Sequence, residues 1–372
     1  MGIGASAGGL EAFTELVKHL PTDTGMAFVL IQHLDPRHES RLAELVSRAT
    51  KMPVAEVVQD MPVKPDHIYI IAPNANMVVA GRVLHVTTRA ETHGPHLPID
   101  NFLYSLADAE KSRAVGVILS GTGSDGTRGL RAVKAGGGIT LAQELKSAKY
   151  DGMARSAIAA GCVDLVLPPQ DIAAEITRIA RHPYVIPRQS SQAGEPPQEN
   201  GLYQVLLLVR RALGVDFTQY RRTTINRRVA RRMLLHRLDS LADYVKYLQR
   251  SPAEVNALYE DILIHVTAFF RDPATFHALG EKVFPRLVEN RAPDAPIRMW
   301  VPGCSTGEEV YSIALSLLEF LGDRAAGTPI QIFGTDLNEA AVGKARTATY
   351  LENIRAEVSA ERLKRFFVKA DG

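Results

Sequence analysis

Three residues in the first third of the chain are of the types that catalyse acyl transfer. Ser6 lies in a glycine-rich turn, His33 directly follows the apolar run 27–32, and Asp125 comes soon after the apolar run 114–120. Acyl transfer by a serine needs a base that takes its proton and a carboxylate that orients the base. Backbone N–H groups of a helix that begins after Ser6 could also stabilise an oxyanion. The three side chains are therefore candidates for a nucleophilic triad.

Each of the three residues also has a structural explanation when it is taken alone. Serine is common in glycine-rich turns, a histidine at a strand end is often only a hydrogen-bonded polar residue, and an aspartate before glycine is typical of turns and helix N-caps. Glycine-rich first turns also bind phosphates. The turn around Ser6 lacks the G-x-G-x-x-G spacing, and no acidic residue follows at a strand end about 20 residues later, as a dinucleotide site requires. The triad interpretation depends on the equivalent positions of all three residues.

The elements that must position this triad are predicted from the alternation of apolar runs and helical patterns in residues 1–180. Such alternation favours an α/β fold with a doubly wound, mostly parallel sheet. The predicted strands are 27–32, 67–72, 78–80 with 83–86, 114–120, 138–142 and 162–167, and the predicted helices are 10–19, 40–50, 99–109, 126–135, 154–160 and 171–181. Because the carboxyl ends of parallel strands share one edge of a sheet, Ser6, His33 and Asp125 can meet there.

Residues 2–180 resemble the catalytic domain of the CheB-type protein-glutamate methylesterases of chemotaxis. The matching stretches, in the order of the family, are 2–12, 31–34, 67–73, 98–100 and 118–126. The resemblance implies that Ser6 is the nucleophile, His33 the base and Asp125 the orienting carboxylate. Asp100 is the rival carboxylate. The implied reaction is hydrolysis of glutamyl γ-methyl esters on a chemoreceptor, with glutamine deamidation as a related activity and without a cofactor. One departure from the family is Met153-Ala154, where Met-Pro is usual.

The composition is that of a globular protein, because 46% of the 372 residues are hydrophobic and 23% are charged. The net charge of +2 implies no bulk affinity for nucleic acid or membranes. The chain has two cysteines, too few for a disulfide framework, and no apolar run of the roughly 18 residues that span a bilayer. No signal peptide opens it. We therefore expect a cytoplasmic protein that is not inserted into a membrane.

A strongly basic segment follows a linker rich in proline and serine at 182–200. Apolar positions at helical spacing predict a small helical domain over 201–275. Arg228, Arg231 and Arg232 fall on nearly one side of a helix in which no acidic residue interrupts 217–236. This pattern favours a surface for an acidic ligand, either nucleic acid or a protein helix. Few aromatic residues are interleaved with the arginines, so base stacking is not supported.

The α/β pattern returns in 276–372, where a glycine-rich turn at 303–309 follows the predicted strand 297–301. Asp336 ends the next predicted strand, 331–335, at a position that could hold ribose hydroxyls. The turn has no P-loop lysine, so a nucleoside cofactor is favoured over a triphosphate. A Rossmann-like turn without a cofactor is the alternative.

Residues 201–372 resemble the N-terminal part of the CheR-type chemoreceptor methyltransferases, which use S-adenosylmethionine. The matching stretches are 220–228, 266–272, 303–309, 311–314 and 335–336. The resemblance implies that S-adenosylmethionine is the cofactor of this half. The implied cofactor contacts are Thr267, Arg271, Glu309 and Asp336. At the position of His265 the family commonly has an asparagine that also contacts the cofactor. The basic helix is implied to bind an acidic receptor helix, with Arg228, Arg231 and Arg232 as the substrate-binding residues.

The sequence thus predicts four segments: an esterase domain at 1–181, a linker at 182–200, a helical domain at 201–275 and a partial methyltransferase domain at 276–372. We expect a bifunctional enzyme that modifies a methyl-accepting chemoreceptor or a similar acidic helical protein, without nucleic acid and without a metal. Later methyltransferase motifs are missing from these residues, so we expect weak cofactor binding and no methyl transfer. The alternative is a non-enzymatic signalling scaffold that binds receptor-like helices.

Overall fold

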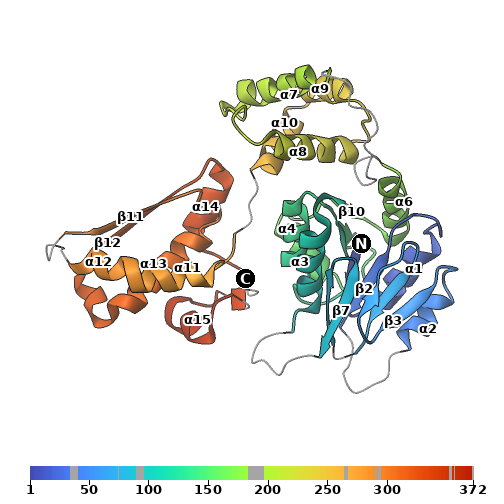
Figure 1. Cartoon of the computed structure of the whole chain (residues 1–372), viewed down its shortest axis with the longest axis horizontal. Helices are drawn as coiled ribbons and strands as arrows, with labels where there is room; N and C mark the ends of the chain where they lie inside the picture. Colours follow the sequence, from blue (N-terminus) through green and yellow to red (C-terminus); the bar gives the residue numbers. More distant parts are fainter. Residues whose placement is uncertain are drawn as a thin grey trace. The chain divides into compact units, whose positions relative to one another are not determined.

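The computed structural model describes residues 1–33, 41–73, 75–88, 96–182, 197–263, 267–289, 291, 295–351, 354–355 and 357–370. The chain divides into two compact units, of which unit 1 ends at Ile262 and unit 2 continues to Gly372 (Figure 1). Unit 1 holds both the predicted esterase domain and the helices that follow the linker. The boundary between the units comes earlier in the chain than the predicted boundary at residue 275.

Unit 1 contains a seven-stranded sheet in the order β10-β9-β8-β1-β2-β5-β3, and all its pairs are parallel. Its strands are β1 (Gly2–Ala5), β2 (Phe28–Gln32), β3 (Val54–Val57), β5 (Ile68–Ile71), β8 (Val115–Ile118), β9 (Ile139–Gln143) and β10 (Leu165–Leu167). The strand order reverses at β1, which pairs with β2 on one side and with β8 on the other. The doubly wound parallel sheet is therefore confirmed, and the end of β1 is the point where such sheets bind ligands.

Helices cover both faces of this sheet, so its strands are apolar on both sides. They are α1 (Gly9–Lys18), α2 (Leu42–Ser47), α3 (Pro98–Glu110), α4 (Thr127–Gly136), α5 (Gly152–Ala159) and α6 (Pro169–Ala180). Along β2, Phe28 and Leu30 belong to the cluster that contains α1 and α6 residues. Val29 and Ile31 belong to the cluster with α3, α4 and α5 residues. This alternation fixes β2, and thus His33 after it, in register.

The predicted strand pair 78–80 and 83–86 is a hairpin outside the main sheet. Strands β4 (Met61–Pro62), β6 (Ala75–Ala80) and β7 (Val83–Thr88) form an antiparallel sheet in the order β4-β7-β6. Its strand β6 packs against α3. Strand β3 was not predicted, because its four residues are mixed in polarity and mostly half-buried.

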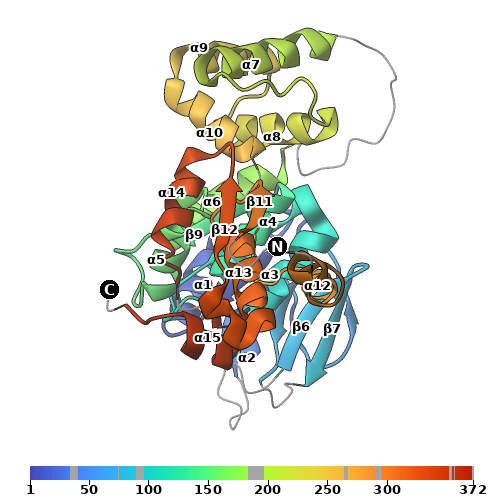
Figure 2. The ribbon, with the colours of Figure 1, turned by 90° about the vertical axis from the view of Figure 1, so that its left-hand side faces the viewer.

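Four helices complete unit 1: α7 (Pro197–Leu213), α8 (Arg222–Leu235), α9 (Leu241–Arg250) and α10 (Pro252–Ile262). Figure 2 shows α7 and α9 lying side by side, and these two helices make the most contacts among the four. The hydroxyl of Ser240 accepts a hydrogen bond from the backbone N–H of Asp243 and so caps α9. We call residues 197–262 the helical segment.

Unit 2 contains a βαβ arrangement, with β11 (Ile297–Pro302) and β12 (Ile330–Thr335) parallel and α13 (Glu308–Leu321) between them in sequence. Its other helical elements are α11 (Pro273–Ala278), η2 (Leu279–Val283), α12 (Phe284–Glu289), η3 (Gly322–Gly327), α14 (Glu339–Thr347) and α15 (Ala360–Phe366). Trp300 pairs with Phe333 across the two strands, and these side chains are 70% and 54% exposed. Within the residues described above, no helix is both long and apolar enough to cross a membrane.

Candidate active site

The structure brings Ser6, His33 and Asp125 together at the carboxyl end of the main sheet. Ser6 follows β1, His33 follows the neighbouring β2, and Asp125 lies between β8 and α4. The Nδ1 atom of His33 lies 3.3 Å from Ser6 Oγ, and its Nε2 atom lies 2.8 Å from Asp125 Oδ2. The imidazole therefore bridges a hydroxyl and a carboxylate, which is the geometry that a nucleophilic triad requires.

The turn that presents Ser6 can be made only with small residues. Gly8 has φ of +71°, and a Cβ atom there would lie 2.7 Å from Ser120 Oγ. A Cβ atom on Gly9 would lie 2.5 Å from that of Ala5. The Ser6 N–H donates to the carbonyl of Ser120, and α1 begins at Gly9. The tight turn thus places the N-terminal end of α1, where unpaired N–H groups gather, beside the serine.

Asp125 is held by the first turn of α3 and is only 3% exposed. Its Oδ2 accepts a hydrogen bond from the Ile99 N–H at 3.1 Å, and its Oδ1 accepts one from the Asp100 N–H at 2.9 Å. The positive end of the α3 dipole lies at the same place. These contacts fix the orientation of the carboxylate and the oxygen that faces His33.

Asp100 lies next to Asp125, but its carboxylate contacts α4 and not His33. Its Oδ1 accepts the Gly129 N–H of α4 at 2.7 Å, while its Oδ2 is buried and has no hydrogen-bond partner in the described part of the chain. Burial and the neighbouring Asp125 carboxylate raise the pKa of Asp100 to about 7. Of the two carboxylates, Asp125 is the one in contact with the histidine.

Sequence reasoning missed the contacts that Ser120 and Met153 make around the serine turn. The Ser120 hydroxyl donates to the Ala7 carbonyl at 2.8 Å and accepts from the Tyr150 N–H at 3.0 Å. Met153 is fully buried, and a Cβ atom on Gly121 would lie 2.2 Å from its sulfur and 2.9 Å from Ser6 Cβ. Met153 therefore packs close to the serine. Two signals were available: Ser120 ends a predicted strand, and Met153 belongs to the Met153-Ala154 pair that departs from the family.

In unit 2, Asp336 ties together the two loops that follow β11 and β12. Its Oδ2 accepts the Ser305 N–H, and its Oδ1 accepts the Asn338 N–H, both at 2.8 Å. Gly303 and Gly307 have φ of +69° and +96°, so the loop after β11 needs glycine at both positions. The chemistry of this arrangement suits a ligand with hydroxyl groups, because each carboxylate oxygen can accept a further hydrogen bond.

Of the other predicted cofactor residues, one belongs to α13 and two lie in a segment that contacts α13. Glu309 lies in the first turn of α13 and is exposed. Thr267 and Arg271 flank Phe270, whose N–H donates to the Ser312 hydroxyl of α13 at 3.0 Å. His265 lies outside the described residues. Among the predicted cofactor residues, Asp336 is the one for which the structure gives a hydrogen bond to the glycine-rich loop, from the Ser305 N–H.

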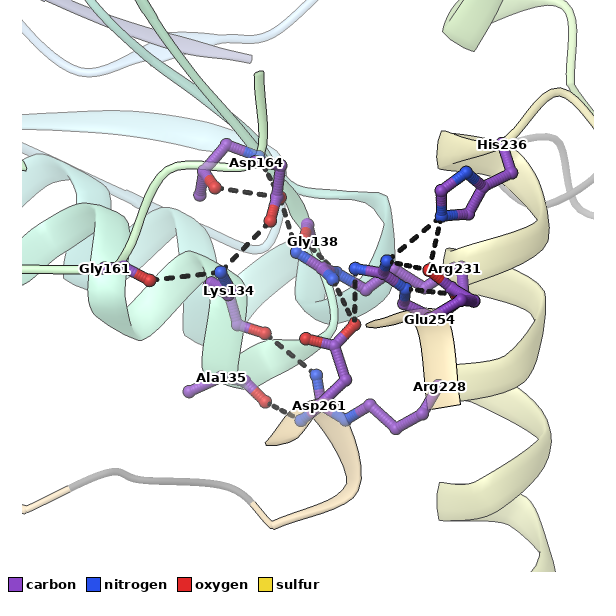
Figure 3. A network of polar contacts seen from close by, with 12 residues as sticks. Lys134, Ala135, Gly138, Gly161, Asp164, Arg228, Arg231, His236, Glu254 and Asp261 are labelled. Atoms are coloured by element: carbon purple, nitrogen blue, oxygen red, sulfur yellow. Dashed lines mark hydrogen bonds and ion pairs between the residues drawn. The ribbon is translucent and has the colours of Figure 1, made fainter. Parts of the chain in front are cut away.

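The expectation that Arg228, Arg231 and Arg232 form one exposed surface is wrong. Arg228 and Arg231 are 2% and 0% exposed, and the Arg232 side chain is 15% exposed. Their guanidinium groups bind carboxylates and carbonyls from other elements of unit 1 (Figure 3). A count of charges along one helix did not include acceptors from elsewhere in the chain. Exposed arginines lie instead at the two ends of α8, with Arg221 and Arg222 at its start and Arg237 after its end.

Comparison with known families gives three matches that together cover most of the chain. The CheB methylesterase model matches residues 1–176, the all-alpha domain model of CheR methyltransferase matches 200–263, and its SAM binding domain model matches 265–372. The matched boundary near residue 264 agrees with the boundary between the two units.

Individual relatives are matched over different shares of their own length. An uncharacterized 104.1 kDa protein in the hypE 3' region of Rhodobacter capsulatus is 35% identical over 354 residues, which are 89% of this chain and 37% of that protein. Protein-glutamate methylesterase/protein-glutamine glutaminase 2 of Burkholderia lata is 37% identical over 48% of this chain and 53% of its own length. The crystal structure of the Thermotoga maritima CheB methylesterase catalytic domain is 27% identical over 48% of this chain and 96% of that chain, with a TM-score of 0.45. The chain spans about half or less of the length of these curated relatives.

Proposed function

The chain joins a domain of the CheB methylesterase family to the two domains of the CheR methyltransferase family, and from this we propose that it removes methyl groups from glutamate side chains of chemoreceptors and carries a module of the opposite reaction, which adds them. The hydrolytic half of the proposal is supported by the bridging position of His33 between Ser6 and Asp125. We further propose that the protein acts in the cytoplasm.

The proposed hydrolysis follows from the protonation states that this geometry favours. A neutral His33 that carries its proton on Nε2 donates to Asp125 and leaves Nδ1 to accept the Ser6 proton. Ser6 Oγ then attacks the ester carbonyl, and His33 returns the proton to the departing methoxide, which leaves as methanol. Water, activated by the same histidine, releases the glutamate and restores the serine. With glutamine as the substrate, the leaving group is ammonia.

Two groups of this site stabilise charges that appear during the reaction. The oxyanion of the tetrahedral intermediate forms beside the N-terminal end of α1, whose backbone N–H groups can donate to it. Asp125 stabilises the imidazolium form of His33, because this carboxylate is buried and anchored by two N–H groups of α3. The site needs no cofactor for these steps.

For the transferase half, we propose that Thr267, Arg271, Glu309 and Asp336 hold S-adenosylmethionine. The cofactor supplies the methyl group that passes to a glutamate carboxylate. Asp336 offers acceptor capacity to ribose hydroxyls at the end of β12, and Glu309 offers an exposed carboxylate in the first turn of α13. The acidic receptor helix would find exposed positive charge at Arg221 and Arg222.

Methanol release from a methylated receptor fragment tests the hydrolytic function. The 372-residue chain should release methanol, and its Ser6→Ala variant should not. Ser47→Ala is the matched control, because Ser47 is exposed on α2 and should leave the rate unchanged. Receptor binding without methanol release would instead favour the non-enzymatic scaffold.

A further inference from the structure

Helix α8 directs its central arginines toward the esterase domain of the same chain. The Arg231 side chain is fully buried, and its guanidinium binds Asp164 directly before β10 as well as Asp261 of α10. Its Nε also donates to the carbonyl of Gly138, which directly precedes β9, at 3.0 Å. One arginine thus joins the edge of the main sheet to the helical segment (Figure 3).

Arg228, one turn earlier on α8, binds the C-terminal end of α4. It donates to the carbonyl oxygens of Lys134 and Ala135, with the Nη1 to Lys134 distance at 2.9 Å. The last carbonyls of a helix have no partner within the helix and carry the negative end of its dipole. The Lys134 carbonyl already accepts the Gly137 N–H, so Arg228 adds a charged donor there and supplies a donor to the Ala135 carbonyl.

Apolar packing accompanies these polar contacts. Leu234 of α8 is fully buried and belongs to the same hydrophobic cluster as Ile139 of β9 and Ile176 of α6. Leu235 packs against that cluster from a partly buried position. The inward side of α8 thus combines two arginines with a leucine anchor, as stable interfaces inside proteins do.

The acids opposite Arg231 depend on its charge. Burial by itself would raise the pKa of Asp164, but Arg231 and Lys134 hold that pKa below its ordinary value. Asp164 is therefore ionised although its side chain is only 2% exposed. Removal of Arg231 would leave two carboxylates, Asp164 and Asp261, with reduced compensation in a buried place.

We propose that the inward side of α8, formed by Arg228, Arg231 and Leu234, is the surface by which the helical segment binds the esterase domain of its own chain. The basic residues there recognise the buried acids and helix carbonyls of that domain and are not offered to an external protein. Where a receptor helix binds the segment, a point that depends on the function proposed above, it meets exposed arginines such as Arg221 and not the buried Arg228 and Arg231. The binding of the helical segment to the esterase domain requires neither ester hydrolysis nor methyl transfer.

Two adjacent arginines provide a matched pair of variants. Arg231 contacts the esterase domain, whereas Arg232 binds Glu254, His236 and Asp261, all of which belong to the helical segment. Hydrogen exchange of the whole chain, followed by mass spectrometry, reports on β9 and β10 separately from α8. Arg231→Met should accelerate exchange in β9 and β10 by at least about ten-fold. Arg232→Met should change α8 and α10 and leave β9 and β10 within about two-fold.

A double-mutant cycle with Asp164→Asn then decides whether the two domains are coupled. In Arg231→Met/Asp164→Asn, the acceleration in β9 and β10 should fall short of the product of the two single effects by about ten-fold. If Arg231→Met does not fold, Arg231→Lys serves in the same cycle, because it keeps the charge and loses the fork of donors. Unchanged exchange in β9 and β10, or effects that multiply independently, would overturn the docking proposal. Neither outcome depends on methanol release or on receptor binding, so the proposed function is tested separately.

Discussion

The two candidate sites use the same structural device to different ends. In each, an aspartate after a parallel strand accepts two backbone N–H groups: Asp125 from Ile99 and Asp100, and Asp336 from Ser305 and Asn338. Asp125 is also in contact with His33, whereas Asp336 contacts only backbone groups of its loops among the contacts described above. In the proposed esterase site the side chains thus contact one another directly. In the proposed transferase site we expect the predicted side chains to be connected by the bound cofactor.

The sheets that carry the two aspartates explain the difference. The esterase residues follow three adjacent strands in the interior of a seven-stranded sheet, with helices on both faces. In the described part of unit 2 the sheet has two strands, and Trp300 and Phe333 on it are largely exposed. A site in the middle of a covered sheet is more rigidly positioned than one on a two-stranded sheet. The predictions below test this contrast.

The largest effect is expected for the residues that act together in the esterase site. Ser6→Ala and His33→Ala should each lower the rate of methanol release by on the order of 10⁴-fold or more, because neither residue can act without the other. The double variant should be little slower than either single variant. Rates are measured as kcat/KM on one methylated receptor fragment, and losses that multiply in the double variant would contradict the shared triad.

The next effect separates the two carboxylates of this site. Asp125→Asn should lower kcat about 10³-fold, because the amide can no longer stabilise the imidazolium of His33. Asp100→Asn should cost at most about ten-fold, since Asp100 contacts the Gly129 N–H and not the histidine. If Asp100→Asn cripples turnover and Asp125→Asn does not, the carboxylates have been assigned in the wrong order.

The meeting of Ser6, His33 and Asp125 and the main sheet could be predicted from sequence because their signals are local. Apolar runs mark β2 and β8, and a polar residue directly after a parallel strand lies at the ligand-binding edge whatever the rest of the fold. Strand β3 gave no such signal, since half-buried residues make its pattern weak. The support of Ser6 by Ser120 and Met153 was also invisible, because it depends on contacts between distant segments.

The arginines of α8 show where such reasoning fails. Arg231 pairs with Asp164, which is 67 residues away in the sequence, and with the Gly138 carbonyl, which is 93 residues away. The lack of acidic residues on this helix indicated that its arginines bind acidic groups elsewhere. It could not reveal that some of these groups belong to the same chain. Burial of a guanidinium is a tertiary property that no window of the sequence reports.

The raised pKa of Asp100 predicts a pH dependence of stability specific to unit 1. This pKa is raised from its ordinary value near 4 to about 7, so the folded state keeps the proton over a range in which the unfolded state loses it. The stabilisation is fully present below about pH 4 and is lost as the pH rises through about 7. Asp100→Asn should therefore gain stability relative to the parent chain by about 4 kcal/mol between these pH values.

Calorimetry can assign this change to the correct unit. The chain has a single tryptophan, Trp300, which belongs to unit 2, so a heat-absorption peak without a change in tryptophan fluorescence reports on unit 1. Asp108→Asn is the control, because Asp108 is exposed on the same helix, α3. A difference between Asp100→Asn and the parent chain that stays constant from pH 4 to 7 would refute the assigned titration.

The smallest effect concerns the transferase site, where we expect S-adenosylmethionine to bind weakly to these 372 residues because the cofactor would lie against a two-stranded, partly exposed sheet. Asp336→Asn should weaken this binding about ten-fold, since an amide offers one acceptor atom where the carboxylate offers two. One of the N–H groups of Ser305 and Asn338 would then lose its acceptor, and the glycine loop would be less ordered. Titration calorimetry measures the Kd, with Asp323→Asn, an exposed aspartate of unit 2, as the control. Tight binding by the parent chain would show that the two-stranded sheet suffices, and equal Kd values for Asp336→Asn and the parent chain would remove Asp336 from the site.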